Sequence, residues 1–365
     1  MYTWQAGKIS LPDAFFTKFW PLLAFLIWSL LACTWSLTPS VNAGAVAKIV
    51  LSLCVGASVY SYLQWDSQTK FMKWFATGYI IALSLLILDE ILNTYILRSL
   101  RGPHMETKEY SHGLTLLVLS LWSMMTFLKE QHLSRKLLLY VTLFIGLFYM
   151  TDHSATLAFF VSTVVFFIVY FSPKFFIRLS AVLSVVVIMS FPLLMHQIDP
   201  QQVIQSAGSV LLKKSYHHRL FILKRTATMI FKRPWMGHGL DSYRSTTDTK
   251  ADFATEVSKL HVLEQNPELN PDVLGQATHP HNFSLQLWFE LGAIGAVLFS
   301  LFLFTSLWRI SSTEGKTLEK SAFMGTYSGM FLIAHTAFGA WQTWWLISTA
   351  VILAINYAYI YKKAE

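Results

Sequence analysis

The chain has 365 residues, of which 54% are hydrophobic and only 13% are charged, whereas soluble domains carry about 25% charged residues. This deficit, with a mean hydropathy of +0.46, excludes an ordinary soluble enzyme. It predicts an all-α integral membrane protein, because apolar runs of this length are typical of membrane-spanning helices. The net charge of +8 could indicate nucleic acid as a partner, but its distribution over the loops fits membrane orientation better, so we expect no nucleic acid.

Ten apolar runs approach the length of about 20 residues that a helix needs to cross the hydrocarbon core. We expect them to form about 10 transmembrane helices of a single polytopic domain over residues 1–365. The first run lacks a small-residue cleavage site, so we expect it to remain as a span instead of being removed as a signal peptide. The runs are 19–37, 43–63, 74–96, 113–128, 137–150, 155–171, 177–195, 283–307, 323–338 and 341–361.

The short loops between these runs differ in their content of Lys and Arg. With the N-terminus placed inside, every inside loop carries Lys or Arg, whereas three of the short outside loops carry none. This asymmetry follows the positive-inside rule. It predicts that both termini are cytoplasmic and that the long segment 196–282 lies outside, in the periplasm of a Gram-negative cell.

The segment 196–282 carries most of the candidate site residues. Within it, residues 210–232 are predicted to form a helix that ends before Pro234, because the residue before a proline is pushed out of the helical region. Gly237, His238 and Gly239 are predicted to form a turn. The polar residues 246–277 are expected to form a mobile cap.

Helical periodicity sorts the basic residues of 210–232 into two groups. Arg219 lies at the edge of the apolar stripe and is expected to point inward. There it is either a structurally paired arginine or a functional one, since burying arginine is costly without a partner. The other group faces away from the stripe, toward water or lipid headgroups, and consists of Lys214, His218, Arg225 and Lys232.

Two histidines precede the eighth apolar run, in the sequence Thr278-His279-Pro280-His281-Asn282. Thr278 is a plausible helix cap and proline is favoured in a first turn, so we expect His281 in the first turn of the helix. The positive end of the helix dipole disfavours imidazolium there, which predicts a neutral ring able to accept a proton. The alternative is a capping or interface role without chemistry. The sequence contains no metal-ligand spacing, and no metal site is expected.

Two glycines share a helical face with His281, Gly292 closely and Gly295 less so. Glycines on one face let a neighbouring helix approach closely, so we assign both to helix packing. His335, in the ninth apolar run, is expected to be a core histidine with internal hydrogen bonds.

The spacing of these residues resembles a family signature. His281-Asn282, then nine residues, Gly292, two residues and Gly295 match the H-[NSQ]-x9-G-x2-[GTY] pattern of the bacterial O-antigen ligase family. That family is part of a wider superfamily of membrane glycosyltransferases that contains O-antigen ligases and polymerases.

Two further motifs are similar to the superfamily pattern and occur in its order. They are His218-Arg219 at the opening of an amphipathic helix and the sequence RPWMGHG at 233–239. The resemblance is strongest over 215–297. It implies a GT-C-like helical bundle with one large periplasmic loop between the seventh and eighth spans. The family usually has about 12 spans, so two would be missing ahead of this loop.

The resemblance implies an inverting, metal-independent O-antigen ligase without cofactors. Its donor would be a glycan on undecaprenyl diphosphate, and its acceptor a sugar hydroxyl of lipid A–core at the bacterial inner membrane. His281 then becomes the essential catalytic histidine, as a base or as a group that positions the acceptor. Arg219 becomes the arginine that binds the diphosphate, a task that suits a guanidinium group.

One family feature is missing. Relatives tend to carry an arginine at the outer end of the span pair that residues 149–154 represent here, and this chain has none. His153, Arg225 or Arg233 could serve on the phosphates instead, although a structural loop histidine is the alternative for His153. The other expected substrate-binding residues are His218, His238, His279 and Asn282.

The same donor with another acceptor would make the protein an O-antigen polymerase or a protein O-oligosaccharyltransferase. The short chain without an added soluble domain favours the ligase. A membrane transporter would favour internal repeats and polar groups at mid-membrane, and the sequence has no convincing repeat. A non-catalytic glycolipid-binding protein would keep its function when His281 is replaced by alanine.

Overall fold

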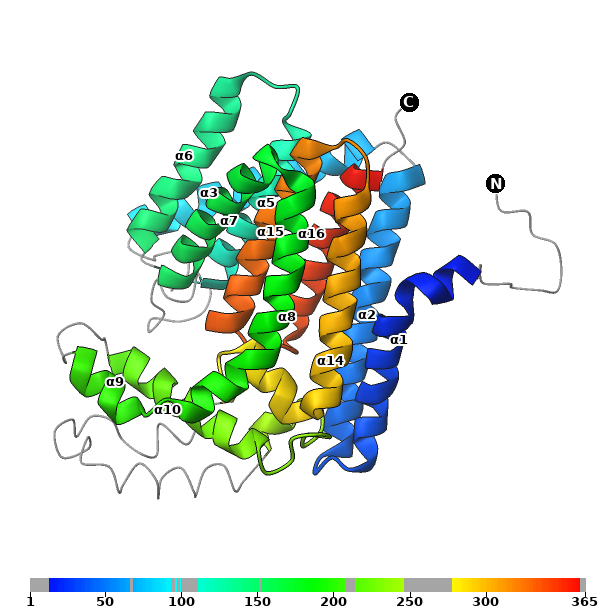
Figure 1. Cartoon of the computed structure of the whole chain (residues 1–365). Coiled ribbons are helices and arrows are strands. Elements are labelled where there is room, and N and C mark those ends of the chain that lie inside the picture. Colours follow the sequence, from blue (N-terminus) through cyan, green and yellow to red (C-terminus); the bar gives the residue numbers. More distant parts are fainter. Residues whose placement is uncertain are drawn as a thin grey trace.

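The computed structural model describes residues 13–65, 68–92, 96, 99, 111–150, 152–207, 214–245 and 278–361. Within these residues the secondary structure is entirely helical (Figure 1). Each of the ten apolar runs coincides largely with a helix. These helices are α1 (Asp13–Leu31), α2 (Pro39–Trp65), α3 (Gln68–Ile91), α5 (Ser111–Phe127), α6 (Leu133–Met150), α7 (His153–Phe171), α8 (Pro173–Gln197), α14 (Phe283–Ser312), α15 (Thr317–Thr336) and α16 (Thr343–Tyr361).

Six of the described helices are long and apolar enough to cross a membrane: α2, α3, α7, α8, α14 and α16. Two shorter apolar helices cover Phe19–Thr34 and Ser111–Phe127. Ten helices thus cover the ten apolar runs and six of them meet these criteria, so the count of ten spans stays a prediction. The other two helices, α6 and α15, carry charged residues in their opening turns, namely Arg135 and Lys136 in α6 and Glu319 and Lys320 in α15.

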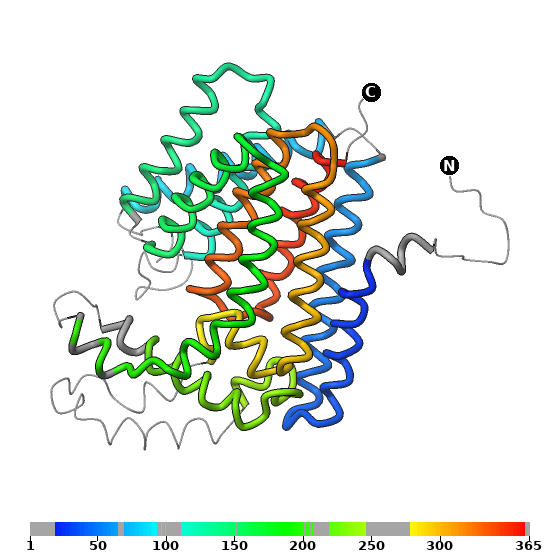
Figure 2. The backbone as a smooth tube through the Cα atoms, in the orientation of Figure 1, coloured from blue at the N-terminus to red at the C-terminus, as the bar shows by residue number. Residues whose placement is uncertain are grey.

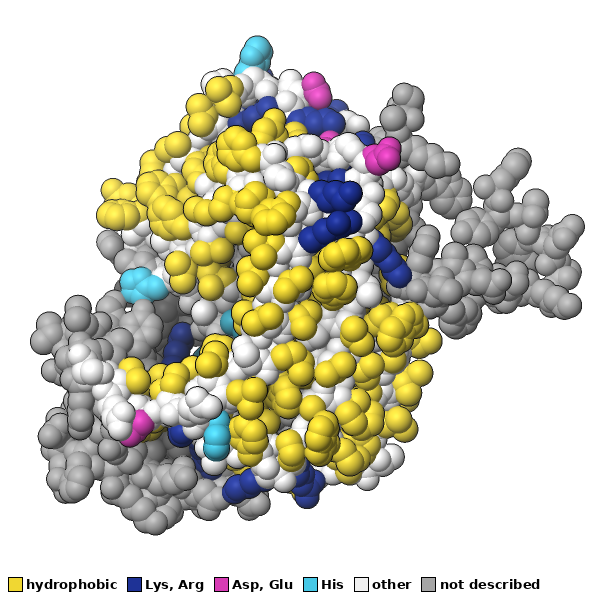
Figure 3. Space-filling view, in the orientation of Figure 1, with side chains coloured by type: hydrophobic (Ala, Val, Ile, Leu, Met, Phe, Trp, Pro, Cys, Tyr) yellow, Lys and Arg dark blue, Asp and Glu magenta, His cyan; other side chains and the backbone are white. Residues whose placement is uncertain are grey.

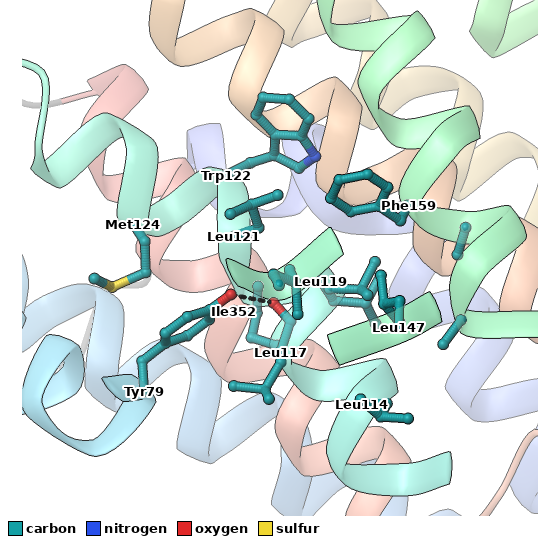
Figure 4. Packing of buried hydrophobic residues seen from close by; sticks show 14 of the residues in the cluster. Tyr79, Leu114, Leu117, Leu119, Leu121, Trp122, Met124, Leu147, Phe159 and Ile352 are labelled. Atoms are coloured by element: carbon teal, nitrogen blue, oxygen red, sulfur yellow. Dashed lines mark hydrogen bonds between the residues drawn. The ribbon is translucent and has the colours of Figure 1, made fainter. Parts of the chain in front are cut away.

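The bundle is held together by neighbouring helices that are distant in sequence. The pairs α14 with α8, α15 with α7 and α16 with α2 pack along one another. One buried cluster joins α3, α5, α6, α7, α15 and α16. Figure 4 shows part of it, where the Tyr79 hydroxyl donates a hydrogen bond of 3.1 Å to the backbone oxygen of Leu117. Burying a phenol in this core requires such a partner.

Apolar side chains also cover much of the outside of the bundle. Figure 3 shows hydrophobic side chains over most of the visible flank. Trp74 is 72% exposed and Phe148 is 75% exposed. An apolar surface this extensive is rare on soluble proteins, and it supports the assignment to a multi-pass membrane protein.

Two helices lie at one end of the bundle and not along it. They are α9 (Pro200–Ala207) and α10 (Lys214–Ile230), which follow α8 and lie across the end where α14 begins (Figures 1 and 2). The helix predicted over 210–232 is confirmed as α10. Beyond it, a short 3-10 helix covers Ser242–Arg244. The expected cap over 246–277 lies outside the described residues.

Candidate active site

The C-terminal end of α15 brings three motif side chains together. The last carbonyls of a helix have no partner within it, and here other segments supply the donors. Asn282 donates to the oxygen of His335 (3.3 Å), Arg219 donates through Nη1 to that of Thr336 (2.8 Å), and His281 donates through Nδ1 to that of Ala337 (2.7 Å). Arg219 and His281 are thus anchored to adjacent peptide groups, although 62 positions of sequence separate them.

The position of His281 differs from the prediction. Helix α14 begins at Phe283, and its N-cap is Asn282, whose side chain accepts a hydrogen bond from the amide of Leu285 at 3.0 Å. Thr278 is not the cap, so the prediction that His281 lies in the first turn was wrong. The physical reason is that the Asn282 amide is itself a strong cap. His281 precedes it with φ of 53°, a left-handed conformation that is uncommon for residues other than glycine.

The contact of His281 with Ala337 determines which ring nitrogen carries the proton. A carbonyl oxygen can only accept, so Nδ1 carries a proton, and when the ring is neutral Nε2 carries the lone pair. A histidine held in this tautomer is suited to act as a base.

His279 lies against His281, with ring centroids 4.2 Å apart. Its Nε2 also approaches the Ala337 oxygen, at 3.4 Å, and its Nδ1 lies 3.0 Å from the Thr278 hydroxyl. Burial, together with the neighbouring His281, lowers the pKa of His279 from 6.5 to about 4. His279 is therefore uncharged at neutral pH and places no positive charge beside His281.

Helix α10 positions Arg219 as predicted, but Arg225 differs. Arg219 is half-buried and reaches α15, which confirms its inward direction. Arg225 was expected to face water or headgroups, and it is buried. The reason is that the segment after α10 folds back over this face, where the Thr226 and Tyr243 hydroxyls lie 3.1 Å apart. Both Lys232 and Arg233 remain exposed.

Two other predicted site residues, His218 and His153, lie near the N-terminal ends of helices. His218 lies in the first turns of α10, and its side chain is outside the described part of the chain. His153 is exposed at the first residue of α7. The carboxylate of Asp152 caps that helix by accepting hydrogen bonds from the amides of Ser154 (2.9 Å) and Ala155 (3.0 Å).

Helix α14 is broken at Gly292, which has φ of 65° and ψ of −170°. The break leaves backbone groups on both sides without helical partners. Residues 234–239, which we call the strap, supply the missing partners. The four hydrogen bonds run from Ala293 N to Pro234 O (2.8 Å), from Ile294 N to Trp235 O (3.4 Å), from His238 N to Phe289 O (3.0 Å) and from Gly239 N to Glu290 O (2.8 Å).

The strap changes the role assigned to the two glycines. A Cβ on Gly292 would collide with the backbone of Trp235 and Met236, and one on Gly237 would lie 2.5 Å from the carbonyl carbon of Glu290. Gly292 therefore admits the strap, and the prediction that it admits a neighbouring helix was wrong. A Cβ on Gly295 would collide with Leu291 of the same helix. Periodicity missed this because it assumes an unbroken helix between His281 and Gly295.

His238 is part of this connection. Its ring stacks on Phe289 with centroids 4.4 Å apart and planes 11° apart, and its Nδ1 lies 3.0 Å from the Phe289 oxygen. Burial lowers the pKa of His238. These contacts give the buried imidazole a structural role in fixing the strap to α14.

A polar pocket of about 580 Å³ adjoins His279. Its lining comes from several separate parts of the chain. It includes Lys48 of α2, His112 of α5, Asp241 and Arg244 after α10, Gln286 of α14, Trp341 just before α16 and Trp344 in the first turn of α16. Neither Arg219 nor His281 is among its lining residues, so His279 is the predicted site residue that connects the pocket with the anchored pair.

Comparison with known proteins identifies the domain that carries these features. Residues 138–300 match the family model described as O-antigen ligase. This match covers the strap and the segment from His281 to Gly295. This part of the chain is therefore similar to the O-antigen ligase family.

Proteins named as proposed polysaccharide ligases are similar to this chain over most of their length. The Rickettsia conorii protein is 25% identical over 337 residues, which are 91% of this chain and 77% of the relative. The Rickettsia felis protein is 23% identical over 338 residues, covering 91% and 78%. The Rickettsia typhi protein is 25% identical over 340 residues, covering 91% and 78%. No solved structure matches the chain.

Sequence reasoning missed Glu290, the most buried acid among the residues that the structure describes. Glu290 is fully buried in α14 and accepts hydrogen bonds from the backbone amide of Asp241 (2.7 Å), the amide of Gln286 (2.9 Å) and the indole of Trp341. Gln286 in turn accepts from the backbone amide of Ala340 at 2.9 Å. A signal was present, because an ionisable residue inside an apolar run is expensive and therefore informative.

Proposed function

We propose that this protein transfers a glycan from undecaprenyl diphosphate to a sugar hydroxyl of lipid A–core in lipopolysaccharide biosynthesis. The match of residues 138–300 to the O-antigen ligase family model and the names of the relatives support this activity. The observation that carries the proposal is the anchoring of His281 and Arg219 to the adjacent carbonyls of Ala337 and Thr336. It holds a basic nitrogen and a guanidinium group next to each other at the end of the bundle.

In the proposed reaction, Nε2 of His281 accepts the proton of the acceptor hydroxyl or orients that hydroxyl. The acceptor oxygen attacks the anomeric carbon, a new glycosidic bond forms with inversion, and the bond between that carbon and the diphosphate oxygen breaks. Undecaprenyl diphosphate leaves with the bonding electrons. Arg219 stabilises the charge on the leaving group, because only Nη1 is used on Thr336 and the guanidinium has five N–H donors.

The proposed setting is the bacterial inner membrane. Both termini lie in the cytoplasm in this proposal, and the end of the bundle with α9, α10 and the site faces the periplasm. The distribution of Lys and Arg over the short loops supports this orientation. Both substrates are anchored in lipid, so a site at the membrane surface can reach both of them.

The test is the lipopolysaccharide banding of a strain that lacks the gene, complemented with wild type, His281→Ala or His132→Ala. His132 is an exposed histidine between α5 and α6 and serves as a matched control. We expect loss of the polymer ladder, restored by wild type and His132→Ala but not by His281→Ala. A single added repeat in place of the ladder would indicate a polymerase. An unchanged ladder would contradict the proposal and direct the search to protein glycans.

The proposed mechanism uses protein side chains without a metal ion. Transfer by the purified protein in proteoliposomes should therefore continue in excess chelator. Loss of transfer that added divalent metal restores would contradict this part of the proposal.

A further inference from the structure

The polar pocket beside His279 has a chemical character of its own. Lys48 and Arg244 contribute two positive charges, and Asp241 contributes one carboxylate, with Lys48 Nζ and Asp241 Oδ2 3.6 Å apart. Burial raises the pKa of Asp241, while Lys48 and Arg244 oppose that shift. Because the cations outnumber the carboxylate and His279 is neutral at pH 7, the pocket favours an anionic ligand.

One wall of the pocket is aromatic. The indole N–H groups of its two tryptophans are already used, that of Trp341 on Glu290 and that of Trp344 on Gln342 at 2.8 Å. With the polar atoms used, the half-buried Trp344 and the small part of Trp341 that lines the pocket offer ring surface to a ligand. The negative face of an aromatic ring attracts C–H groups, and a sugar ring presents such groups on its flat sides.

The pocket is also held in a fixed shape. Glu290 binds both the Asp241 backbone and the Trp341 indole, and Gln286 binds the backbone of Ala340. Asp241 has φ of 55°, a left-handed conformation that the surrounding structure must maintain. A cationic end and an aromatic wall are thus presented together, without reorganisation on binding.

From these observations we infer that the pocket is the acceptor subsite and takes a sugar that carries a phosphate or carboxylate group. Lys48 and Arg244 contact the anionic group, and the indoles of Trp341 and Trp344 pack against the sugar ring. This inference rests on the proposed function. The volume of about 580 Å³ lies within the usual range for sites that enclose a small ligand, and His279 connects the pocket with His281.

The donor also carries a sugar beside phosphate, so the test must separate the two substrates. Initial rates in proteoliposomes are measured with acceptor varied at saturating donor, and then with donor varied at saturating acceptor. The variants are Lys48→Gln, Arg244→Gln and their combination, with Lys232→Gln as the control because Lys232 is an exposed cation at the same end of the bundle.

For the double variant we expect the acceptor KM to rise at least about tenfold, the scale of losing charge-assisted contacts to an anion. We expect kcat, the donor KM and all values for Lys232→Gln to stay within about twofold of wild type. With acceptor whose phosphates have been removed, wild type should show the raised KM and the double variant should change no further. A rise in the donor KM alone, or equal KM values for both acceptors in wild type, would overturn the inference.

A binding measurement keeps the inference independent of transfer. Purified lipid A–core, intact or chemically dephosphorylated, is added to wild type or the double variant in detergent, and thermal stabilisation is recorded. Stabilisation of wild type by the intact glycolipid alone, absent in the double variant, would support the subsite even if no transfer occurred and the proposed function failed. Equal stabilisation of both proteins would overturn the subsite, whatever the transfer assay gave.

Discussion

The two halves of α14 differ although they form one hydrophobic segment. In the first half, residues 283–291, Leu285, Leu287, Phe289 and Leu291 are all fully buried, and so is Glu290. In the second half, residues 293–312, Ile294, Val297 and Trp308 are 37%, 41% and 38% exposed. The second half has the one-sided burial of an ordinary helix at a lipid surface, whereas the first half is buried except for the half-buried Phe283 and Trp288.

The break at Gly292 explains the difference between the two halves of α14. An unbroken helix satisfies its own backbone and can offer only side chains to its neighbours. The break at Gly292 exposes backbone groups to the strap, so that the RPWMGHG motif and the segment after His281 form one unit. The first half of α14 directly follows His281 and carries Gln286 and Glu290 beside the pocket, and the second half packs in the bundle.

Gly292→Ala tests whether the two halves of α14 must differ, and it should have the largest effect on transfer and Tm. Only glycine adopts φ of 65° with ψ of −170° readily, and a substitution there costs about 1–3 kcal/mol in backbone strain before the collision with Trp235 is counted. We expect transfer to fall to background and Tm to decrease.

The matched control is Gly78→Ala in α3, where nothing lies within 4 Å of the added Cβ. It should leave transfer and Tm unchanged or raise Tm slightly, since alanine is the better helix former. Wild-type transfer and Tm in Gly292→Ala would show that the break is dispensable.

Glu290→Leu tests whether the first half of α14 supports the pocket. The substitution leaves the Asp241 amide and the Trp341 indole buried without an acceptor, at about 1–3 kcal/mol for each unsatisfied group. We expect a lower Tm and a higher acceptor KM, with Glu290→Gln intermediate. Glu314→Gln, at an exposed acid after α14, is the control. An unchanged acceptor KM in a folded Glu290→Leu protein would limit Glu290 to a stabilising role.

The substitution Arg219→Lys tests whether the contact with α15 needs a planar guanidinium group. An ammonium group can replace the charge but cannot bond to Thr336 and a diphosphate with the same fixed geometry. We expect turnover to fall about tenfold at normal expression. Arg135→Lys, at an exposed arginine of α6, should behave as wild type. Equal turnover of the two variants would argue against a diphosphate contact for Arg219.

The smallest effect concerns pH. Because burial lowers the pKa of His279 from 6.5 to about 4, the unfolded chain binds a proton at this residue more readily than the folded protein does. The contribution of His279 to stability is therefore complete above pH 6.5 and is lost as pH falls toward 4. We expect Tm to decrease by several degrees over this window, at about 2–4 °C for each kcal/mol.

His279→Asn should flatten this dependence, whereas His132→Asn, at an exposed position, should keep it. A wild-type Tm that rises as the pH falls from 6.5 to 4 would contradict the sign of the predicted shift. Circular dichroism at several pH values is sufficient for this measurement.

The sequence was most informative where one helix could be considered alone. Hydropathy located ten helices, and periodicity predicted the inward direction of Arg219. It failed for Arg225, because a later segment covers the face that periodicity assigned to solvent. It also failed at Gly292 and at the start of α14, because the strap and the Asn282 cap act through backbone groups, whose pairing leaves no periodic pattern in side chains. Glu290 could have been found from its charge within an apolar run.

The order of the segments along the chain has a consequence for biogenesis. The strap precedes α14 in the sequence, so it is already synthesised when Gly292 leaves the ribosome. The backbone groups of α14 beside Gly292 can therefore pair with the strap as soon as the segment after His281 is made. The carbonyls that anchor Arg219 and His281 belong to the end of α15 and are synthesised later. A nascent chain that stops before α15 therefore contains Arg219, the RPWMGHG motif and the segment from His281 to Gly295, but it cannot yet assemble the candidate site.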